Sequence, residues 1–290
     1  MICSLCPRNC GAERTEDRAG GFCAQPLRPV AAKAMLHLWE EPCLVGEHGA
    51  GTVFFSGCNL RCCFCQNRPI SQGGIGKPLT VERLREIFRE LIVQGAACID
   101  LVTPTQFTPA ILEALGEETW PVPVVWNCGG YEKVETLRLL AGKVQVYLPD
   151  LKYALAGPAE RYSGAADYVH FAKAAILEMF RQTGPYCMEN GSLRRGVLIR
   201  HLLLPGEMEN TRRVIDWVAE TFRPGDVLFS LMSQYTPQSG AAGTLARHVT
   251  KAEYRSALQY MGNCGVVDGY MQERTSAREE FTPSFDLTGV

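Results

Sequence analysis

The sequence predicts an α/β fold, a partial (β/α)6 TIM-like barrel with an N-terminal Cys-rich cap. From about residue 51, short apolar runs alternate with amphipathic segments of helical period. Repeated units of strand then helix build a parallel sheet with right-handed crossovers. Six units are too few for a full eight-fold barrel, and the GxGxxG sequence of dinucleotide-binding folds does not open the first helix. An open, partial barrel therefore fits best.

Each unit is assigned from its local pattern. The expected strands are the apolar runs 52–55, 98–103, 122–127, 144–148, 196–204 and 227–232. The expected helices are the amphipathic segments 81–94, 109–115, 132–140, 159–182, 211–222 and 250–261. Thr80 stands directly before the first of these helices and suits its N-cap.

The chain is expected to divide into three regions. They are a Cys-rich cap over residues 1–45, the barrel over 46–271, and a C-terminal tail over 272–290. The tail is too apolar for a solvated end, so we expect it to pack back on the body through Phe281, Phe285, Leu287 and Val290.

The composition indicates a globular protein. Of 290 residues, 46% are hydrophobic and 21% are charged, which is enough to bury a large core. The formal net charge is −2 and like charges do not cluster, so we expect neither a nucleic-acid partner nor an anionic membrane surface. The sequence shows neither a membrane-spanning apolar run nor a signal peptide, so we expect a soluble, cytoplasmic protein.

The chain contains 13 cysteines, and in a reducing compartment such a number points to metal rather than to disulfides. Strand 52–55 runs into a loop in which Cys58, Cys62 and Cys65 form CxxxCxxC, with Cys63 as a spare. A [4Fe-4S] cluster held by three thiolates keeps one iron open to a further ligand, whereas four thiolates would close it. The alternative is a zinc ion completed by a distant fourth ligand.

With the aromatic Phe64 before its last cysteine, this loop resembles the CxxxCx(aromatic)C hallmark of the radical S-adenosylmethionine (radical SAM) superfamily. Seven segments, which cover nearly the whole chain, resemble the branch of pyruvate formate-lyase activating enzymes: CSLCPRNCG, HLWEEPCLVGEHGAGTVFFSGCNLRCCFCQN, LVTPTQF, WNCGGYE, YLPDLKY, IRHLLLPG and LMSQYTP. The resemblance implies an oxygen-sensitive oxidoreductase. It would use a [4Fe-4S] cluster to cleave S-adenosylmethionine reductively to a 5′-deoxyadenosyl radical that abstracts hydrogen.

The resemblance also implies partners. They are an external one-electron reductant of flavodoxin or ferredoxin type, and a glycyl-radical enzyme or other polypeptide as the substrate of an activating enzyme. A second hypothesis is radical SAM modification of a peptide or small molecule, which the sequence does not separate from the first. A third is a non-catalytic electron-transfer or zinc-binding module, but such a module has no use for a barrel or an open iron.

Polar residues at strand ends are candidates for binding S-adenosylmethionine. In YLPDLKY, Asp150 and Lys152 share one strand face, and the resemblance implies that this DLK segment lies near the cofactor; the alternative is a surface ion pair. Thr103 stands where the family has a Gly-Gly-Glu segment, and its hydroxyl or carbonyl could serve instead. Asn127, which ends the third strand, either lines the site or caps a turn.

Arg200 and His201 interrupt an otherwise apolar strand. Consecutive strand residues point to opposite faces, so only one of the two enters the barrel. Each needs a partner when buried, either a ligand or a carboxylate, and the sequence does not decide which of them faces the site.

A second set of cysteines lies near the N-terminus, spaced Cys3-x2-Cys6-x3-Cys10-x12-Cys23. Four thiolates would close a structural zinc site or a second iron–sulfur cluster. Free thiols are the alternative, but a cap with so little apolar periodicity needs something to hold it. The spacing does not distinguish zinc from iron–sulfur.

Overall fold

The computed structural model describes residues 2–272 and 283–290. Its strands are β1 (Val30–His37), β2 (Ala50–Phe55), β3 (Lys77–Pro78), β4 (Ile99–Val102), β5 (Val124–Cys128), β6 (Val146–Pro149), β7 (Cys187–Glu189), β8 (Ser192–Leu202), β9 (Leu228–Met232) and β10 (Gly269–Met271). Its α-helices are α1 (Pro42–Val45), α2 (Arg68–Ser71), α3 (Val81–Val93), α4 (Thr108–Leu115), α5 (Val134–Arg138), α6 (Ala156–Ser163), α7 (Tyr168–Thr183), α8 (Met208–Thr221) and α9 (Lys251–Asn263).

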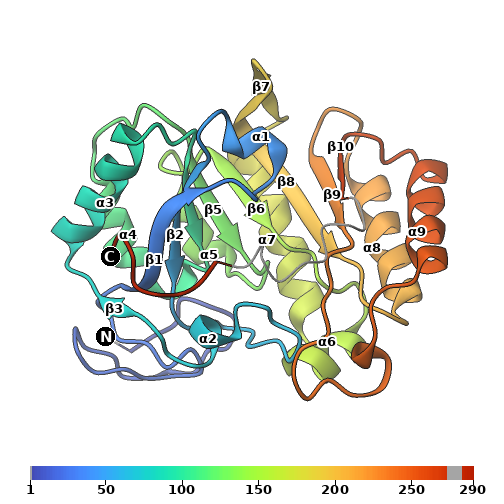
Figure 1. The fold of residues 1–290 in the computed structure, drawn as a ribbon, viewed down its shortest axis with the longest axis horizontal. Coiled ribbons are helices and arrows are strands. Elements are labelled where there is room, and N and C mark those ends of the chain that lie inside the picture. The colour runs from blue at the N-terminus through green and yellow to red at the C-terminus, as the bar shows by residue number, and fades with distance from the viewer. Residues whose placement is uncertain (1, 273–282) are drawn as a thin grey trace.

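In the described residues these strands form one sheet, in the order β10–β9–β8–β6–β5–β4–β2–β1–β3, with β7 paired to β8 (Figure 1). The six expected strands are β2, β4, β5, β6, β8 and β9, and each pairs in parallel with the next. Every residue of β2, β4, β5, β6 and β9 is buried, as in parallel sheets enclosed by helices. The structure confirms an α/β fold with one large sheet, and the partial barrel stays a prediction.

The expected single helix over 159–182 is wrong, because this stretch forms two helices, α6 and α7. Helix α6 ends at Ser163, and Gly164 follows in the left-handed conformation (φ 54°, ψ 41°). A glycine in this conformation stops a helix while satisfying its last carbonyl groups. The turn places the backbone carbonyls of Ser163 and Gly164 beside the cysteine loop, where Arg8 binds them.

Strand β1 is not expected from the sequence, and it lies within the stretch assigned to the cap. It pairs antiparallel with β2 and, at Val30 and Ala31, with β3. Its sequence VAAKAMLH is rich in alanine, which has a low strand propensity, and Lys33 interrupts its apolar pattern. Lys33 is buried and pairs with Asp286 of the C-terminal tail, at 3.0 Å.

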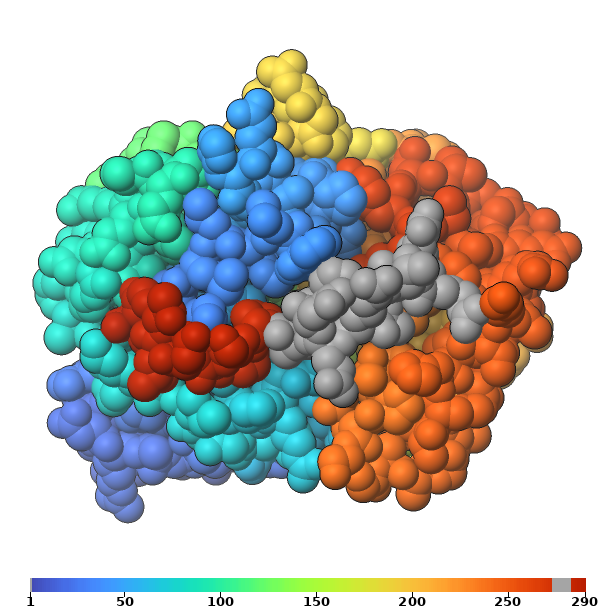
Figure 2. All heavy atoms as spheres, in the orientation of Figure 1, coloured from blue at the N-terminus to red at the C-terminus, as the bar shows by residue number. Residues whose placement is uncertain are grey.

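The tail, residues 283–290, packs back on the body as its apolar sequence predicts (Figure 2, red). Leu287 N–H donates to the Ala32 carbonyl (3.1 Å), and Ala34 N–H donates to the Thr288 carbonyl (3.0 Å). Phe285 packs edge-on against Phe54, with ring centroids 5.7 Å apart. Phe281 lies outside the described residues.

Among the helices of the described chain, none has both the length and the apolar character that crossing a membrane requires.

Candidate functional site

A cavity of about 220 Å³ lies at the carboxyl ends of the parallel strands. This is the edge at which α/β folds build their sites, because loops from neighbouring strands meet there. The cavity is lined by every residue that the sequence singled out for the cluster and for S-adenosylmethionine: Cys58, Cys62, Cys65, Thr103, Asn127, Asp150 and Lys152. Segments that are up to about a hundred positions apart in the chain therefore meet in one place.

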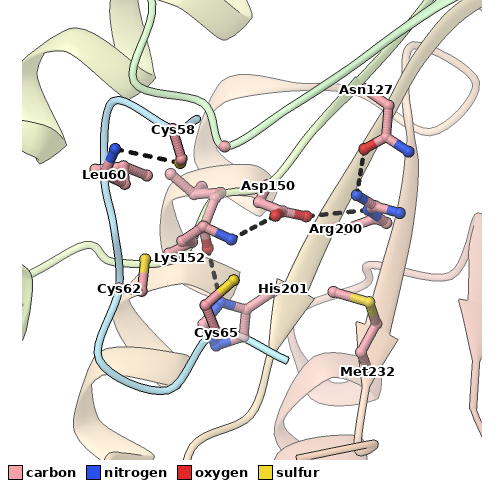
Figure 3. Close-up of polar contacts among 12 residues, drawn as sticks. Cys58, Leu60, Cys62, Cys65, Asn127, Asp150, Lys152, Arg200, His201 and Met232 are labelled. Carbon is pink, nitrogen blue, oxygen red and sulfur yellow. Dashed lines mark hydrogen bonds and ion pairs between the residues drawn. The ribbon is translucent and has the colours of Figure 1, made fainter. Parts of the chain in front are cut away.

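The cysteine loop follows β2 directly. Cys62 is buried, Cys58 and Cys65 are half-buried, and Cys63 is exposed. Figure 3 shows the Cys58, Cys62 and Cys65 side chains along the loop, beside Lys152. Each of the three sulfurs accepts a hydrogen bond from the protein: Leu60 N–H to Cys58 (3.3 Å), Ser163 Oγ to Cys62 (3.0 Å) and Ser71 Oγ to Cys65 (3.4 Å). Hydrogen bonds to sulfur stabilise ligating thiolates and tune the metal that they hold.

Burial disfavours ionisation of two of these thiols, Cys62 and Cys65. It raises the pKa of Cys62 to about 12 and also raises the pKa of Cys65, although the Lys152 ammonium acts in the opposite direction on both. A buried thiol of this kind becomes a thiolate when a positive partner, such as a metal, takes the place of its proton.

The donor set fits an iron–sulfur cluster better than a single ion. The thiols of Cys58, Cys62 and Cys65 line a cavity of about 220 Å³, and a cubane cluster binds its cysteines at separate corners. Three soft sulfur donors, each with its own hydrogen bond, match that requirement.

Arg200 faces the cavity and ties its polar wall together (Figure 3). Its guanidinium donates to Asp150 Oδ1 (3.0 Å), Glu40 Oε1 (3.0 Å) and Asn127 Oδ1 (2.6 Å). Asn127 Nδ2 in turn donates to Glu40 Oε2 (3.0 Å), and Lys152 Nζ donates to Asp150 Oδ2. The positive charges of Arg200 and Lys152 thus balance the negative charges of two carboxylates, Glu40 and Asp150, on this wall.

Asp150 stays ionised in this arrangement. Burial alone would raise the pKa of its carboxyl, but the adjacent Lys152 and Arg200 together hold that pKa below its ordinary value. The expected pairing of Asp150 with Lys152 is therefore present, and it forms part of a larger, nearly buried network rather than an exposed ion pair.

His201 points to the other face of β8, which answers the question that the sequence left open. It is buried, with Nδ1 at 2.7 Å from the Leu151 carbonyl and Nε2 at 3.0 Å from Thr211 Oγ1. Because the carbonyl can only accept, Nδ1 carries the proton and Nε2 accepts from the Thr211 hydroxyl. Burial lowers the pKa of His201 to about 4, so the ring is neutral at pH 7 and supports the wall from behind.

Thr103 has an unusual backbone for a β-branched residue, with φ at +59°. Its N–H donates to the Asn127 carbonyl (2.8 Å), and its own carbonyl accepts from Gln106 Nε2 (2.8 Å). Strained backbone of this kind persists where its surroundings hold it, often next to a ligand site. Thr103 thus forms a strained turn at the cavity wall.

Two residues of the site are missed by the sequence patterns. Glu40 and Glu41 both line the cavity, and they follow the unexpected strand β1 rather than one of the parallel strands. Burial, together with the neighbouring Glu40, raises the pKa of Glu41 to about 7. The run HLWEEP contains both acids, but only the folded sheet brings them to Arg200.

The four cysteines of the cap, Cys3, Cys6, Cys10 and Cys23, line a separate cavity of about 10 Å³. Arg8 and Arg14 line it too. The structure therefore brings both predicted cysteine sets together, each in its own place.

Comparison with known proteins supports the fold. No protein-family model matches the chain. A curated relative, Uncharacterized protein MJ0674 of Methanocaldococcus jannaschii, is 29% identical over 274 residues, which cover 89% of this chain and 73% of the relative. SuiB of Streptococcus suis with bound S-adenosylmethionine is 13% identical with a TM-score of 0.50, covering 79% of this chain and 52% of SuiB.

Two further SuiB structures give similar values. SuiB bound to the precursor peptide SuiA has a TM-score of 0.49 at 13% identity, covering 75% of this chain and 47% of SuiB. A further structure of SuiB has a TM-score of 0.48 at 12% identity, covering 77% of this chain and 48% of SuiB. The chain spans about half the length of these solved proteins. At such identities the likeness concerns the α/β fold, and the chemistry has to be argued from the site.

Proposed function

We propose that this protein is a radical SAM enzyme. The observation that carries the proposal is the convergence on one cavity of three hydrogen-bonded thiols and a charged polar wall. A non-catalytic electron carrier would need the thiols but not the wall. The SuiB structure with bound S-adenosylmethionine, which has a similar fold, supports the same cofactor. In this proposal the six parallel units are a partial (β/α)6 barrel, with residues 1–45 as its cap.

Cys58, Cys62 and Cys65 would hold a [4Fe-4S] cluster with one iron open to the amino and carboxylate groups of S-adenosylmethionine. When bound, the cluster supplies one electron that cleaves the cofactor to methionine and a 5′-deoxyadenosyl radical. The electron comes from an external reductant, for which a flavodoxin or ferredoxin is suited. The chain's own part is to bind the reactants, to orient them and to keep water out.

The charged wall is suited to the polar parts of S-adenosylmethionine. Lys152 offers an ammonium and Asp150 a carboxylate within the same cavity, and the Asn127 amide donates to Glu40 and accepts from Arg200. Hydrogen bonds to ionised groups are short and strong in a desolvated site, so these side chains can fix the cofactor's orientation. Thr103, at the strained turn, also lines this cavity.

For the substrate, we propose a peptide or a small molecule that the radical modifies. The activating role suggested by the sequence has no support of its own in the comparisons, because the curated relative is uncharacterised and the solved proteins are SuiB. An activating enzyme remains a special case of the same chemistry, with a glycine of a folded polypeptide as the hydrogen donor.

The proposal is tested on protein reconstituted anaerobically with iron and sulfide and then reduced. We expect about four irons at this site and formation of 5′-deoxyadenosine from S-adenosylmethionine. Cys62→Ala should lose both, and Cys63→Ala, its neighbour on the same loop, is the matched control that should keep both. Loss of the cluster in Cys63→Ala with retention in Cys62→Ala would overturn the ligand assignment. Absence of 5′-deoxyadenosine from the reduced, cluster-loaded protein would overturn the function.

A second assay separates the substrate classes. Incubation with a glycyl-radical enzyme of the same organism should leave no glycyl radical detectable by electron paramagnetic resonance. Appearance of that signal would restore the activating role.

A further inference from the structure

The first part of the cap, residues 2–29, has little regular structure that could hold it in place. In this stretch the backbone forms two isolated bridges, Ile2 with Glu13 and Gly20 with Gln25, and no helix or strand. Among its apolar side chains, only those of Cys3, Pro7 and Pro29 are buried. Ile2 is 73% exposed. Small regions without a hydrophobic core are usually held by disulfides or by metal, and the cysteines here are free thiols.

All four cap cysteines nevertheless line one cavity, and the local backbone is shaped around them. Gly21, at φ +75°, passes over Cys10 so closely that a Cβ there would lie 2.7 Å from the Cys10 sulfur. Arg14 is fully buried and donates from Nη1 to the Cys3 sulfur (3.4 Å). Its other donors bind the carbonyls of Gln25, Pro26 and Gln106.

The size of this cavity distinguishes a single zinc ion from an iron–sulfur cluster, the two alternatives that the cysteine spacing leaves open. At about 10 Å³ it admits roughly one water-sized body. A cubane cluster requires far more room, and the first cysteine loop has it, with about 220 Å³. A single ion is the species that matches the small cavity.

The charges around the cavity also match a single ion. A divalent cation with four thiolates carries a net charge of −2, and the guanidiniums of Arg8 and Arg14 line the same cavity. Two positive charges beside the sulfurs offset that charge, and N–H···S hydrogen bonds such as that from Arg14 stabilise thiolate ligands.

We propose that Cys3, Cys6, Cys10 and Cys23 bind one divalent metal ion of the zinc class, and that this ion holds Arg8 in position to brace the cysteine loop of the active site. No three donors in the described chain are grouped around one point. The ligand shell therefore closes when the ion binds, by rotation of the thiols, of which Cys10 is exposed and free to move.

Arg8 is the connection between the two cysteine sets. It follows Cys6 in the cap, and its guanidinium donates to the carbonyls of Asn59 (2.7 Å), Ser163 (2.8 Å) and Gly164. Asn59 stands next to Cys58, and Ser163 hydrogen-bonds the Cys62 sulfur. Arg8 also stacks on Phe22, with Cζ 3.9 Å from the ring centroid. Ordering of Cys6 and Cys10 on either side of Arg8 therefore restrains the backbone from which Cys58 and Cys62 extend.

The test uses the full chain carrying Cys58→Ser, Cys62→Ser and Cys65→Ser, so that it does not depend on the proposed function. Titration with Co²⁺ under anaerobic conditions should show one ion per chain, with the intense thiolate-to-cobalt absorption of a tetrahedral four-sulfur site, displaced by Zn²⁺. Adding Cys6→Ser and Cys10→Ser should abolish this absorption. Adding Cys187→Ser and Cys264→Ser, two cysteines outside both sets, should leave it unchanged.

Three outcomes would overturn the site. They are failure to bind Co²⁺, a spectrum with fewer than three thiolates, and reconstitution of this variant with four irons and sulfide. The cobalt spectrum is recorded with all four cap cysteines present, so the conclusion does not depend on whether the variant with the added Cys6→Ser and Cys10→Ser changes folds.

The brace is tested separately by hydrogen exchange in the wild-type sequence. Zinc should slow amide exchange in residues 58–65 by about tenfold, because opening the loop then requires breaking the Arg8 hydrogen bonds. Arg8→Ala should keep one zinc and lose this protection. Equal exchange with and without zinc would show that the cap ion and the loop are independent.

Discussion

The active-site cavity has two unlike walls. The sulfur wall, formed by Cys58, Cys62 and Cys65, comes from a single loop of eight residues. The charged wall, formed by Glu40, Asn127, Asp150, Lys152 and Arg200, comes from four separate segments. The sulfur wall holds three thiols, whereas the charged wall holds two ion-paired cations and two carboxylates. The donors for a metal can thus be local in sequence, while the electrostatics around them require the assembled sheet.

This difference predicts that the sulfur wall serves mainly the chemistry and that the charged wall contributes strongly to stability. Changes in the sulfur wall should remove the chemistry at little cost in stability, because a thiol is a small buried group. Changes in the charged wall should lower stability strongly, because each charge there is buried with its partners. The following predictions test that division.

Arg200→Met should have the largest effect on stability. It leaves the carboxylates of Glu40 and Asp150 buried without their shared cation, so we expect a loss of about 3–5 kcal/mol in the free energy of unfolding. Urea unfolding measures it. The matched control is Arg213→Met on α8, an exposed arginine paired with Glu209, which should cost less than about 1 kcal/mol. Equal losses in both variants would show that the charged wall is not desolvated.

His201, which supports the charged wall from behind, should make stability depend on pH. Its pKa is about 4 in the folded protein and about 6.5 when unfolded, so the unfolded chain binds this proton first. Its contribution is complete above pH 6.5 and is lost as the pH falls towards 4, by about 3 kcal/mol in total.

His201→Gln should remove that part of the pH dependence, as measured by urea unfolding at a series of pH values. If the free energy of unfolding of His201→Gln falls between pH 6.5 and 4 with the same slope as that of the wild type, other groups cause this pH dependence.

Lys152→Met tests the junction of the two walls. Lys152 pairs with Asp150, and its ammonium also acts electrostatically on Cys62 and Cys65. Because Asp150 keeps Arg200, we expect a smaller stability loss of about 1–3 kcal/mol. The affinity for S-adenosylmethionine, measured by calorimetry on cluster-loaded protein, should fall as well. Unchanged affinity would show that Lys152 does not contribute to binding S-adenosylmethionine.

Cys63→Ala should have the smallest effect, about 1 kcal/mol or less in thermal or urea unfolding, because Cys63 is exposed. A larger loss would mean that Cys63, and not one of its neighbours, belongs to the sulfur wall.

The sequence predicts the sulfur wall and three of the five residues of the charged wall, for a physical reason. The spacing of Cys58, Cys62 and Cys65 and the alternation in the DLK segment are local patterns, and each is visible within a few residues. Glu40 is not visible in this way, because its partners Arg200 and Asn127 are 160 and 87 positions away. Only the pairing of β1 with β2 brings Glu40 to the cavity.

Contacts between residues distant in the sequence also explain the other differences between the sequence-based expectations and the structure. The choice between Arg200 and His201 depends on which face of β8 meets the cavity, and that is set by the pairing of β8 with its neighbours. The break between α6 and α7 has a local signal in Gly164, but the apolar pattern continues across it.

The tail, residues 283–290, covers part of a strand edge and so helps to prevent self-association of the protein. One edge of β1 pairs with β2, and on the other edge β3 covers only Val30 and Ala31. The tail occupies the next positions, through the backbone groups of Ala32 and Ala34. An uncovered strand edge is a template on which a second chain can add a strand. Residues 283–290 therefore cover the free edge of β1. A chain that lacks them would expose this unpaired edge beside the cavity, where a second chain could pair with it.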